Sequence, residues 1–384
     1  MRWATSSRPR HGPSRTQPPG QRSVSSGIGS PAYAQGRSRG GRTTVGAVLY
    51  LGVDPIFGEH DTGVGHPERA ERLVAVEAGI AVADLGSDLV RLARHNATRA
   101  ELERVHLAAH LDALEASCRN ERHLDADTPT SRRSWAAAVA AAGSGLAAID
   151  ALAANSAEGA FLAIRPPGHH ARPGQAMGFC LLNNVAIAAA ALRDKGARVA
   201  IVDIDAHHGN GTQETFYSDP DVLYVSFHEW PLYPGTGRHD ETGTGAGLGT
   251  TCNIPLPAGA TGDVYLAALD RVVAPALERF CPDWLLISAG FDAHRDDPLT
   301  GLALSAGDFG LVTQRLVALA PRGRIVTFLE GGYSLTGLRD SVGTVLPVLA
   351  GGSPTVPAGE APTADGPGGR MLDVVESTWT HIED

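Results

Sequence analysis

The sequence predicts a single α/β domain with a mainly parallel sheet and helices on both faces. Three observations lead to this prediction. Short β-branched runs alternate with longer helical stretches over residues 43–352. The runs are almost wholly apolar, as expected for strands that are covered on both faces. Reactive side chains directly follow four of the runs.

The alternation predicts six strands and six helices. The predicted strands are Val45–Leu51, Phe161–Ile164, Val199–Ile204, Val222–Val225, Trp284–Ser288 and Ile325–Leu329. The predicted helices are Pro67–Ala83, Ser134–Ala154, Asn183–Lys195, Asp263–Phe280, Ala306–Ala320 and Leu335–Leu349.

Low-complexity segments flank the predicted domain. Residues 1–42 are rich in Ser, Pro, Gly and Arg, and we interpret them as a disordered basic extension. A nucleic-acid-binding arm and an organelle transit peptide are alternatives to an extension without function, which we favour. The stretch Gly351–Gly369 marks the other boundary, so we expect residues 353–384 to be a low-complexity tail.

Charge and composition restrict the function classes. The chain of 384 residues carries 32 Lys and Arg against 42 Asp and Glu, and eight of the arginines lie in residues 1–42. The remainder is therefore strongly acidic, which argues against nucleic-acid binding by the folded domain and suits cationic partners. The uncharged Ala- and Gly-rich stretch Trp135–Ile149 is too short for a membrane span. Four scattered cysteines form no C-x-x-C pair, which favours a reducing cytoplasm.

Polar residues at four strand ends are the main functional signal. They stand in the segments Arg165–His170, Asp203–Asn210, Asp292–His294 and Glu330–Tyr333. In an open α/β sheet the ligand site lies at the carboxyl ends of the strands. We therefore expect these segments to converge on one edge of the sheet.

A metal site is the first chemistry that these segments predict. Asp205 and His207 are two residues apart at a strand end, so both side chains reach the same side, and Asp292 is the natural third ligand. Two carboxylates and one imidazole suit Zn²⁺ or Fe²⁺ and leave a coordination position open, which is typical of catalysis. Helix capping by Asp205 is the alternative interpretation.

Proton transfer is the second chemistry that these segments predict. His169 and His170 follow a stiff Pro-Pro-Gly turn, and one of them beside a metal-activated water could act as a general base. Asp203 and Asn210 are candidate partners; a carboxylate favours the charged imidazolium, and an amide leaves its histidine nearer neutrality. Tyr333, after two glycines, could donate to a developing oxyanion.

Five motifs in this order resemble the histone deacetylase superfamily, which includes bacterial histone deacetylase-like amidohydrolases, acetylpolyamine amidohydrolases and acetoin-utilisation proteins. The motifs are RPPGHH, GFCLLNN, DIDAHHGNG, SAGFDAH and LEGGY, and the similarity covers about residues 45–350. The resemblance implies an arginase/deacetylase-like fold. It also implies a zinc-dependent hydrolase that removes acetyl groups from acetyl-lysine or a similar small acetylated amine.

The resemblance also implies roles for single residues. Zinc would be bound by Asp205, His207 and Asp292. His170 would be the general base, and His169 with Asp203 would act electrostatically. Tyr333 would bind the oxyanion. Phe179 and Tyr233 match the walls of an acyl-lysine channel, and the Gly178 carbonyl would accept the substrate N–H. A structural K⁺ is implied at Asp203, Asp205, His207, Ser226 and Phe227.

Two positions refine the comparison. Asn210 stands where class I enzymes have an aspartate and is similar to the class II branch and its bacterial relatives. Leu299 stands where a polyamine-selective enzyme can place an acidic residue. The alternatives to the predicted deacetylase are an acetylpolyamine amidohydrolase, a non-catalytic acyl-lysine reader, and a two-metal ureohydrolase that would use His294 or Asp296.

Overall fold

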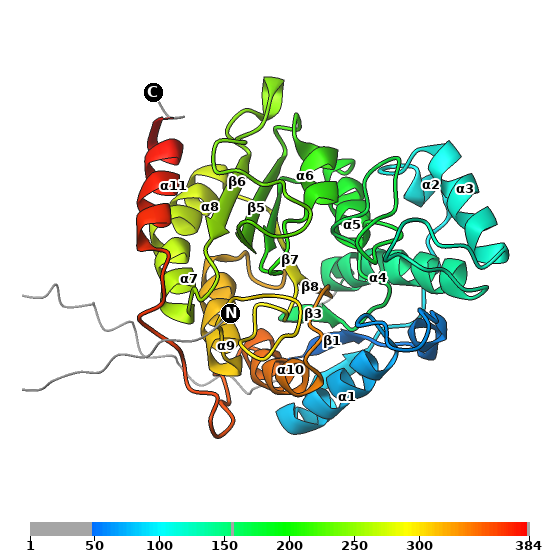
Figure 1. Cartoon of the computed structure of the whole chain (residues 1–384), viewed down its shortest axis with the longest axis horizontal. Helices are drawn as coiled ribbons and strands as arrows, with labels where there is room; N and C mark the ends of the chain where they lie inside the picture. The colour runs from blue at the N-terminus through cyan, green and yellow to red at the C-terminus, as the bar shows by residue number, and fades with distance from the viewer. Residues whose placement is uncertain (1–47, 155–156, 382–384) are drawn as a thin grey trace, which may run out of the picture. The chain divides into compact units, whose positions relative to one another are not determined.

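Eight parallel strands form one sheet in the part of the chain that the computed structural model describes, residues 48–154 and 157–381 (Figure 1). Their order across the sheet is β2-β1-β3-β8-β7-β4-β5-β6. The strands are β1 (Leu49–Gly52), β2 (Leu89–Arg91), β3 (Gly159–Leu162), β4 (Val199–Asp203), β5 (Val222–Glu229), β6 (Thr251–Leu256), β7 (Trp284–Ala289) and β8 (Ile325–Leu329).

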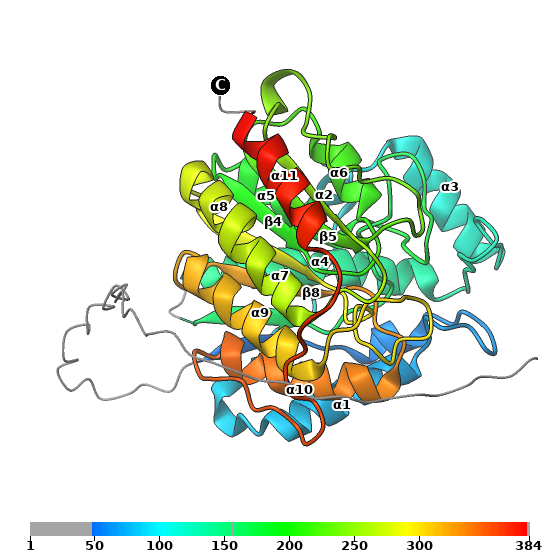
Figure 2. The same cartoon turned by 60° about the vertical axis from the view of Figure 1, so that its left-hand side comes forward.

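Helices cover both faces of the sheet. One face packs against α1 (Glu71–Ala83), α7 (Gly262–Ala268), α9 (Ala306–Leu319) and α10 (Leu335–Leu349), which lie side by side in Figure 2. The other face packs against α4 (Ser134–Ala154) and α5 (Asn184–Arg193). The remaining helices are α2 (Arg99–Leu102), α3 (Ala108–Arg119), α6 (Asn210–Phe216), α8 (Ala274–Phe280) and α11 (Gly369–His381). Shorter helical turns are η1 (Pro55–Glu59), η2 (Gly86–Asp88), η3 (Gly245–Gly247) and η4 (Leu269–Val273).

Strand β4 shows why the strand sequences are mainly apolar. Val199 and Ile201 pack into the core on the α4–α5 face, and Ala200 and Val202 pack into the core on the other face. Successive side chains of a strand point to opposite faces, so a strand that is covered on both sides has few positions that favour a polar residue. The predicted parallel α/β fold is confirmed.

Most predicted elements are present with small shifts of their ends. The ranges Ser134–Ala154, Ile325–Leu329 and Leu335–Leu349 agree to the residue. The predicted helix Asp263–Phe280 is interrupted by the π-helical turn η4 before Pro275, whose missing N–H removes one helical hydrogen bond. Strands β2 and β6 and helices α2, α3, α6 and α11 were not predicted.

The C-terminal boundary differs from the prediction. Residues 353–384 were expected to form a tail, but helix α11 lies within them and packs against β6. Its side chains Leu372, Val375 and Trp379 are buried. The predicted basic extension, residues 1–42, lies outside the described residues.

Helix α4 corrects the argument used against a membrane span. It has 21 residues, which is longer than the uncharged stretch considered above, and its length and composition would suffice to cross a membrane. In its most apolar window 61% of the residues are buried, since α4 packs against the sheet and α5. It therefore serves here as a core helix.

Candidate active site

Four neighbouring strands bring the predicted site segments to one edge of the sheet. In the order β3, β8, β7 and β4, each strand ends at or just before one of these segments. All four run parallel, so their carboxyl ends meet at the same edge. The predicted convergence of these segments follows directly from this strand order.

The three predicted metal ligands meet at this edge. Asp205, His207 and Asp292 each offer a ligand atom within 4.8 Å of the others. His207 Nδ1 lies 3.1 Å from Asp205 Oδ1 and 2.9 Å from Asp292 Oδ2. Although burial lowers the pKa of His207, the two carboxylates raise it well above its usual value. This arrangement concentrates negative charge that a proton or a cation must balance.

Two glycines make room for the carboxylates. A Cβ on Gly331 would lie 2.2 Å from Asp292 Oδ2 and 2.7 Å from Asp205 Oδ2. A Cβ on Gly290 would lie 2.1 Å from Asp205 Oδ2. The Gly331 N–H also donates to Asp205 Oδ2 at 2.8 Å. The oxygen and nitrogen donors and this tight cradle fit a divalent ion such as Zn²⁺ or Fe²⁺.

His169 is held by a carboxylate. Its Nδ1 lies 3.0 Å from Asp203 Oδ2, which also accepts from the Tyr224 hydroxyl at 3.1 Å. Burial opposes a charge on the ring, but the nearby Asp205 and Asp203 carboxylates raise the pKa of His169 to about 10. These carboxylates therefore favour the charged imidazolium form of His169.

His170 is held by an amide. Its Nδ1 lies 2.8 Å from Asn210 Oδ1, and an acceptor there requires Nδ1 to carry the proton. Burial and the neighbouring charge on His169 lower the pKa of His170 well below its usual value. His170 is thus neutral, with its Nε2 free to accept a proton. The structure places each histidine against the candidate partner that was named for it from the sequence.

Tyr333 is fixed through its backbone and ring. Asp297 Oδ2 accepts from the Tyr333 N–H at 2.7 Å, and the Arg72 guanidinium lies 5.1 Å from the ring centroid. The Phe179 ring meets it edge-on, with centroids 5.8 Å apart. The tyrosine therefore sits between the predicted channel wall and a buried arginine.

Of the predicted substrate-binding residues, Tyr233 and Gly178 lie against His170, whereas Leu299 is connected to the site only through its backbone. Tyr233 lies edge-on to His170 with ring centroids 5.2 Å apart, and a Cβ on Gly178 would lie 2.6 Å from His170 Cδ2. Gly178 has a φ of +56°, which favours glycine. Leu299 is linked to the site through its backbone N–H, which donates to Asp297 Oδ1, and its side chain is 38% exposed.

The residues of the predicted K⁺ site lie on two paired strands. Asp203 on β4 is in register with Ser226 on β5, and Phe227 follows Ser226. The Ser226 hydroxyl lies 3.0 Å from His228 Nδ1. The Phe227 ring stacks on Tyr265 in the core, so only the backbone of Phe227 could face an ion.

Sequence reasoning missed the residues that hold this site in place. Glu330 Oε2 accepts from the N–H groups of Gly168 and His169, at 2.6 and 3.2 Å. Arg72 donates to the carbonyls of Glu330 and Gly332, at 2.5 and 2.7 Å. Glu330 could have been found, because it stands inside the LEGGY motif. Asp297 and Arg72 carry no such signal, since their roles arise from tertiary contacts.

Comparison with known proteins decides the family. The model of the histone deacetylase domain matches residues 66–349. The chain belongs to the histone deacetylase family. A probable deacetylase of Archaeoglobus fulgidus is 42% identical over 288 residues, covering 73% of this chain and 79% of the relative.

Further relatives agree with this histone deacetylase assignment. A histone deacetylase-like amidohydrolase of Pseudomonas aeruginosa is 39% identical and covers 70% of this chain and 73% of the relative. The crystal structure of the HDA15 HD domain is similar, with a TM-score of 0.80 and 35% identity, covering 87% of this chain and 95% of that chain. The predicted superfamily and its arginase-like α/β fold are confirmed, and the chain is a deacetylase-family hydrolase.

Proposed function

We propose that this protein is a zinc-dependent deacetylase that hydrolyses acetyl-lysine or a similar small acetylated amine. The observation that carries the proposal is the convergence of Asp205, His207 and Asp292 beside two histidines with different partners. An acyl-lysine reader would need no base and no cradle for a metal ion. The intact pair His169 and His170 therefore favours catalysis.

Zn²⁺ would be held by Asp205, His207 and Asp292 and would supply a Lewis acid for the acyl carbonyl and for an attacking water. Fe²⁺ suits the same donors. His170 Nε2 would take the proton of that water and return it to the leaving amine, since its Nδ1 proton is bound to Asn210. The charged His169 would stabilise negative charge that develops on the acyl oxygen.

The remaining residues would orient the substrate. The Tyr333 hydroxyl would donate to the oxyanion, and its fixed backbone and ring lower the entropic cost of that contact. Phe179 and Tyr233 would flank the aliphatic part of the acylated amine, and the Gly178 carbonyl would accept its N–H. K⁺ would bind at Asp203, Asp205, His207, Ser226 and Phe227 and hold β4 and β5 together.

A polyamine substrate is the second candidate, since the body of the chain is acidic and suits cationic amines. Leu299 provides no negative charge of its own to select them. We also propose that the protein works in a reducing cytoplasm; the cysteines of the described residues are free thiols.

An activity panel tests the proposal. Acetyl-lysine peptides, acetylputrescine and acetylspermidine are incubated with the full chain, with and without a chelator. We expect turnover of the peptides that the chelator abolishes and added Zn²⁺ restores. Preference for the polyamines would select the second candidate, and peptide binding without turnover in metal-loaded protein would indicate a reader.

Metal stoichiometry tests the remaining alternative. A two-metal ureohydrolase would need a second ion near His294 or Asp296. His294 Nδ1 accepts from the Asp296 N–H at 3.2 Å, and Nε2 lies 3.0 Å from Glu360 Oε2, so both ring nitrogens have protein partners. One zinc per chain is expected, and two would contradict the proposal.

A further inference from the structure

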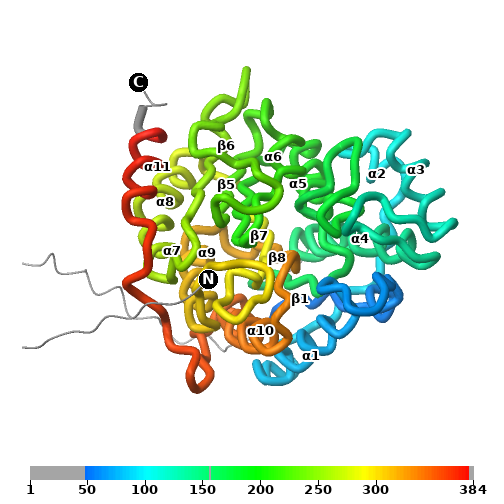
Figure 3. Tube along the Cα trace, in the orientation of Figure 1, coloured from blue at the N-terminus to red at the C-terminus, as the bar shows by residue number. Residues whose placement is uncertain are grey.

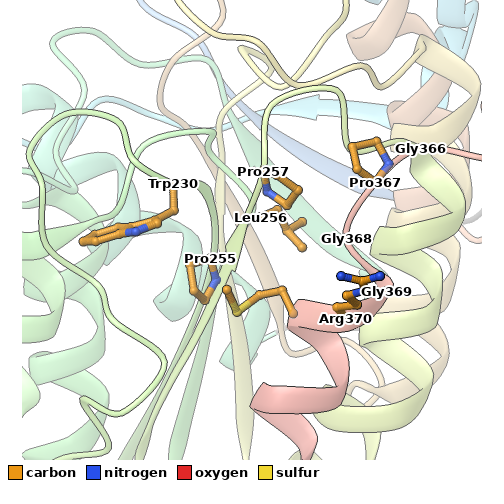
Figure 4. A pocket seen from close by; sticks show the side chains of 10 residues that line it. Trp230, Pro255, Leu256, Pro257, Gly366, Pro367, Gly368, Gly369 and Arg370 are labelled. Carbon is orange, nitrogen blue, oxygen red and sulfur yellow. The ribbon is translucent and has the colours of Figure 1, made fainter.

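The segment between α10 and α11 crosses the helical face of the domain. We name residues 353–368 the C-terminal strap; it lies beyond residue 349, where the match to the family model ends. Figure 3 shows its trace running from α10 past α9 to α11. Its last residues lie beside the end of β6, where Leu256, Pro257 and Pro367 line a hollow of about 500 Å³ (Figure 4).

Glu360 is the most heavily bonded side chain of the C-terminal strap. Its Oε2 accepts from the Ala306 N–H at 2.9 Å and lies 3.0 Å from His294 Nε2. Its Oε1 accepts from Arg295 at 2.5 Å. Only 9% of the residue is exposed, and its pKa is lowered because these donors outweigh the effect of burial. A buried carboxylate with three donors is a strong attachment point.

The residues that Glu360 holds belong to the loop of the proposed active site. His294 lies two residues after the metal ligand Asp292, whose Oδ1 accepts from the Ala206 N–H at 2.8 Å. Three residues after His294, Asp297 accepts from the N–H groups of Tyr333 and Ser334, at 2.7 and 3.3 Å. One short loop thus joins Glu360 to a metal ligand and to the anchor of Tyr333.

The three residues His294, Asp296 and Glu360 do not form a metal site of their own. Both nitrogens of His294 have protein partners, and a guanidinium occupies Glu360 Oε1. A Cβ on Gly337 would lie 2.7 Å from His294 Nδ1, which shows how closely α10 packs against that nitrogen. The cluster therefore fixes the loop that carries His294 and does not bind an ion.

The C-terminal strap is itself fixed on both sides of Glu360. The Gly307 N–H donates to the Glu360 carbonyl at 3.0 Å, and the Thr363 hydroxyl donates to Asp308 Oδ2 at 2.8 Å. The Gly366 N–H donates to the Thr261 hydroxyl at 2.8 Å. These contacts define where the Glu360 carboxylate stands relative to the loop.

We propose that Glu360 is a positioning residue of the active site, through which the C-terminal strap orients the loop that carries Asp292 and anchors Tyr333. The inference rests on the proposed function in taking Asp292 as a metal ligand. The strap is thus part of the catalytic unit, although it lies outside the matched family domain.

Two substitutions in the full chain test this inference. Glu360→Gln keeps the side-chain volume but removes the charge that binds Arg295 and His294, and Glu360→Ala removes all three contacts. Asp373→Asn is the matched control, since it breaks an ion pair between α11 and Arg271 away from the loop. Zinc affinity is measured in buffered Zn²⁺ series, and kcat, KM and Tm are measured for each protein.

For Glu360→Ala we expect zinc affinity and kcat to fall about tenfold each, with KM changed less than twofold. Glu360→Gln should show a smaller loss of both, and it serves as the test variant if the alanine variant does not fold. Asp373→Asn should leave zinc affinity and kcat unchanged.

A lower Tm in both Glu360 variants with unchanged zinc affinity and kcat would overturn the inference, because the contacts would then be structural only. A wild-type chain that binds no zinc would contradict the proposed function instead. The two failures are therefore distinguishable.

Discussion

Two neighbouring histidines of this chain have different hydrogen-bond partners, and their pKa values are shifted in opposite directions. His169 bonds to the Asp203 carboxylate and His170 to the Asn210 amide. A carboxylate stabilises the imidazolium, whereas an amide oxygen only fixes which nitrogen of a neutral ring carries the proton. His169 is therefore suited to electrostatic stabilisation, and the adjacent His170 is suited to proton transfer.

Tyr333 offers a test of a single hydroxyl. Tyr333→Phe keeps the ring between Arg72 and Phe179 but removes the donor. If the hydroxyl acts on the oxyanion, kcat should fall about 10²–10³-fold while KM changes little. Steady-state kinetics on an acetyl-lysine peptide measure this, and an unchanged kcat would remove Tyr333 from the mechanism.

Gly331 offers a test of the metal cradle. In Gly331→Ala the new methyl group would collide with the carboxylates of Asp292 and Asp205, so we expect a large loss of bound zinc and of activity. Gly58→Ala is the matched control, because nothing lies within 4 Å of its added Cβ. Metal content per chain after purification measures the effect. Full zinc occupancy in Gly331→Ala would contradict the described geometry.

Single site residues can be predicted from the sequence where the type of side chain itself indicates the chemistry. Asp205, His207 and Asp292 could be predicted because carboxylates and imidazoles at neighbouring strand ends have few other uses. Asp297 could not, since it acts by accepting two backbone N–H groups from a segment 36 residues away. An ordinary loop aspartate has the same local sequence signal.

For the strands and helices, the degree of burial determines whether an element can be predicted from the sequence. The central strands are long apolar runs, so β4, β7 and β8 were found with their ends nearly correct. The two edge strands were missed: β2 has three residues and is partly exposed, and β6 contains Pro255. Helix α11 was missed because it follows a Gly- and Pro-rich stretch, and only its contact with β6 stabilises it.

His106 links elements that are distant in the chain and gives them a pH dependence. Its Nε2 accepts from the N–H of Asn183, the N-cap of α5, at 2.9 Å, and its Nδ1 donates to the Arg172 carbonyl at 3.1 Å. The ring is thus bound in its neutral form, and burial beside His110 lowers its pKa to about 3.

His106→Gln tests this link. The folded pKa lies below the unfolded value of about 6.5, so the stability that depends on neutral His106 is complete above pH 6.5 and is lost as the pH falls towards 3. The loss approaches about 1.4 kcal/mol per pH unit for this one group. Urea unfolding at pH 7, 6, 5 and 4 should show a shallower decline in the variant than in wild type.

The exposed His123 provides the control for that series. His123→Gln should leave the decline as steep as in wild type, since an exposed ring keeps its contact with water in both states. Equal slopes for His106→Gln and wild type would show that His106 is not the group responsible.

Across the whole domain, the C-terminal strap and α11 complete one of the two cores. Leu372, Val375 and Trp379 belong to the core on the α9–α10 face, in continuity with residues of β6 and α7. Composition alone suggested a boundary at 352, because Gly351–Gly369 has the residues of a linker. Linker composition does not exclude a fixed path when backbone groups are bonded along it, as at Gly366 and Thr363.

Two truncations distinguish a dispensable end from a required one. Removal of residues 1–42 should leave Tm and activity unchanged, since β1 begins at Leu49 and the family match begins at residue 66. Removal of 353–384 should prevent stable folding. Losing three large buried side chains costs about 2–5 kcal/mol each, which is comparable with the total stability of about 5–15 kcal/mol for a domain. Thermal melts and gel filtration of both proteins measure the difference, and a soluble, active 1–352 protein would show that neither α11 nor Glu360 is needed.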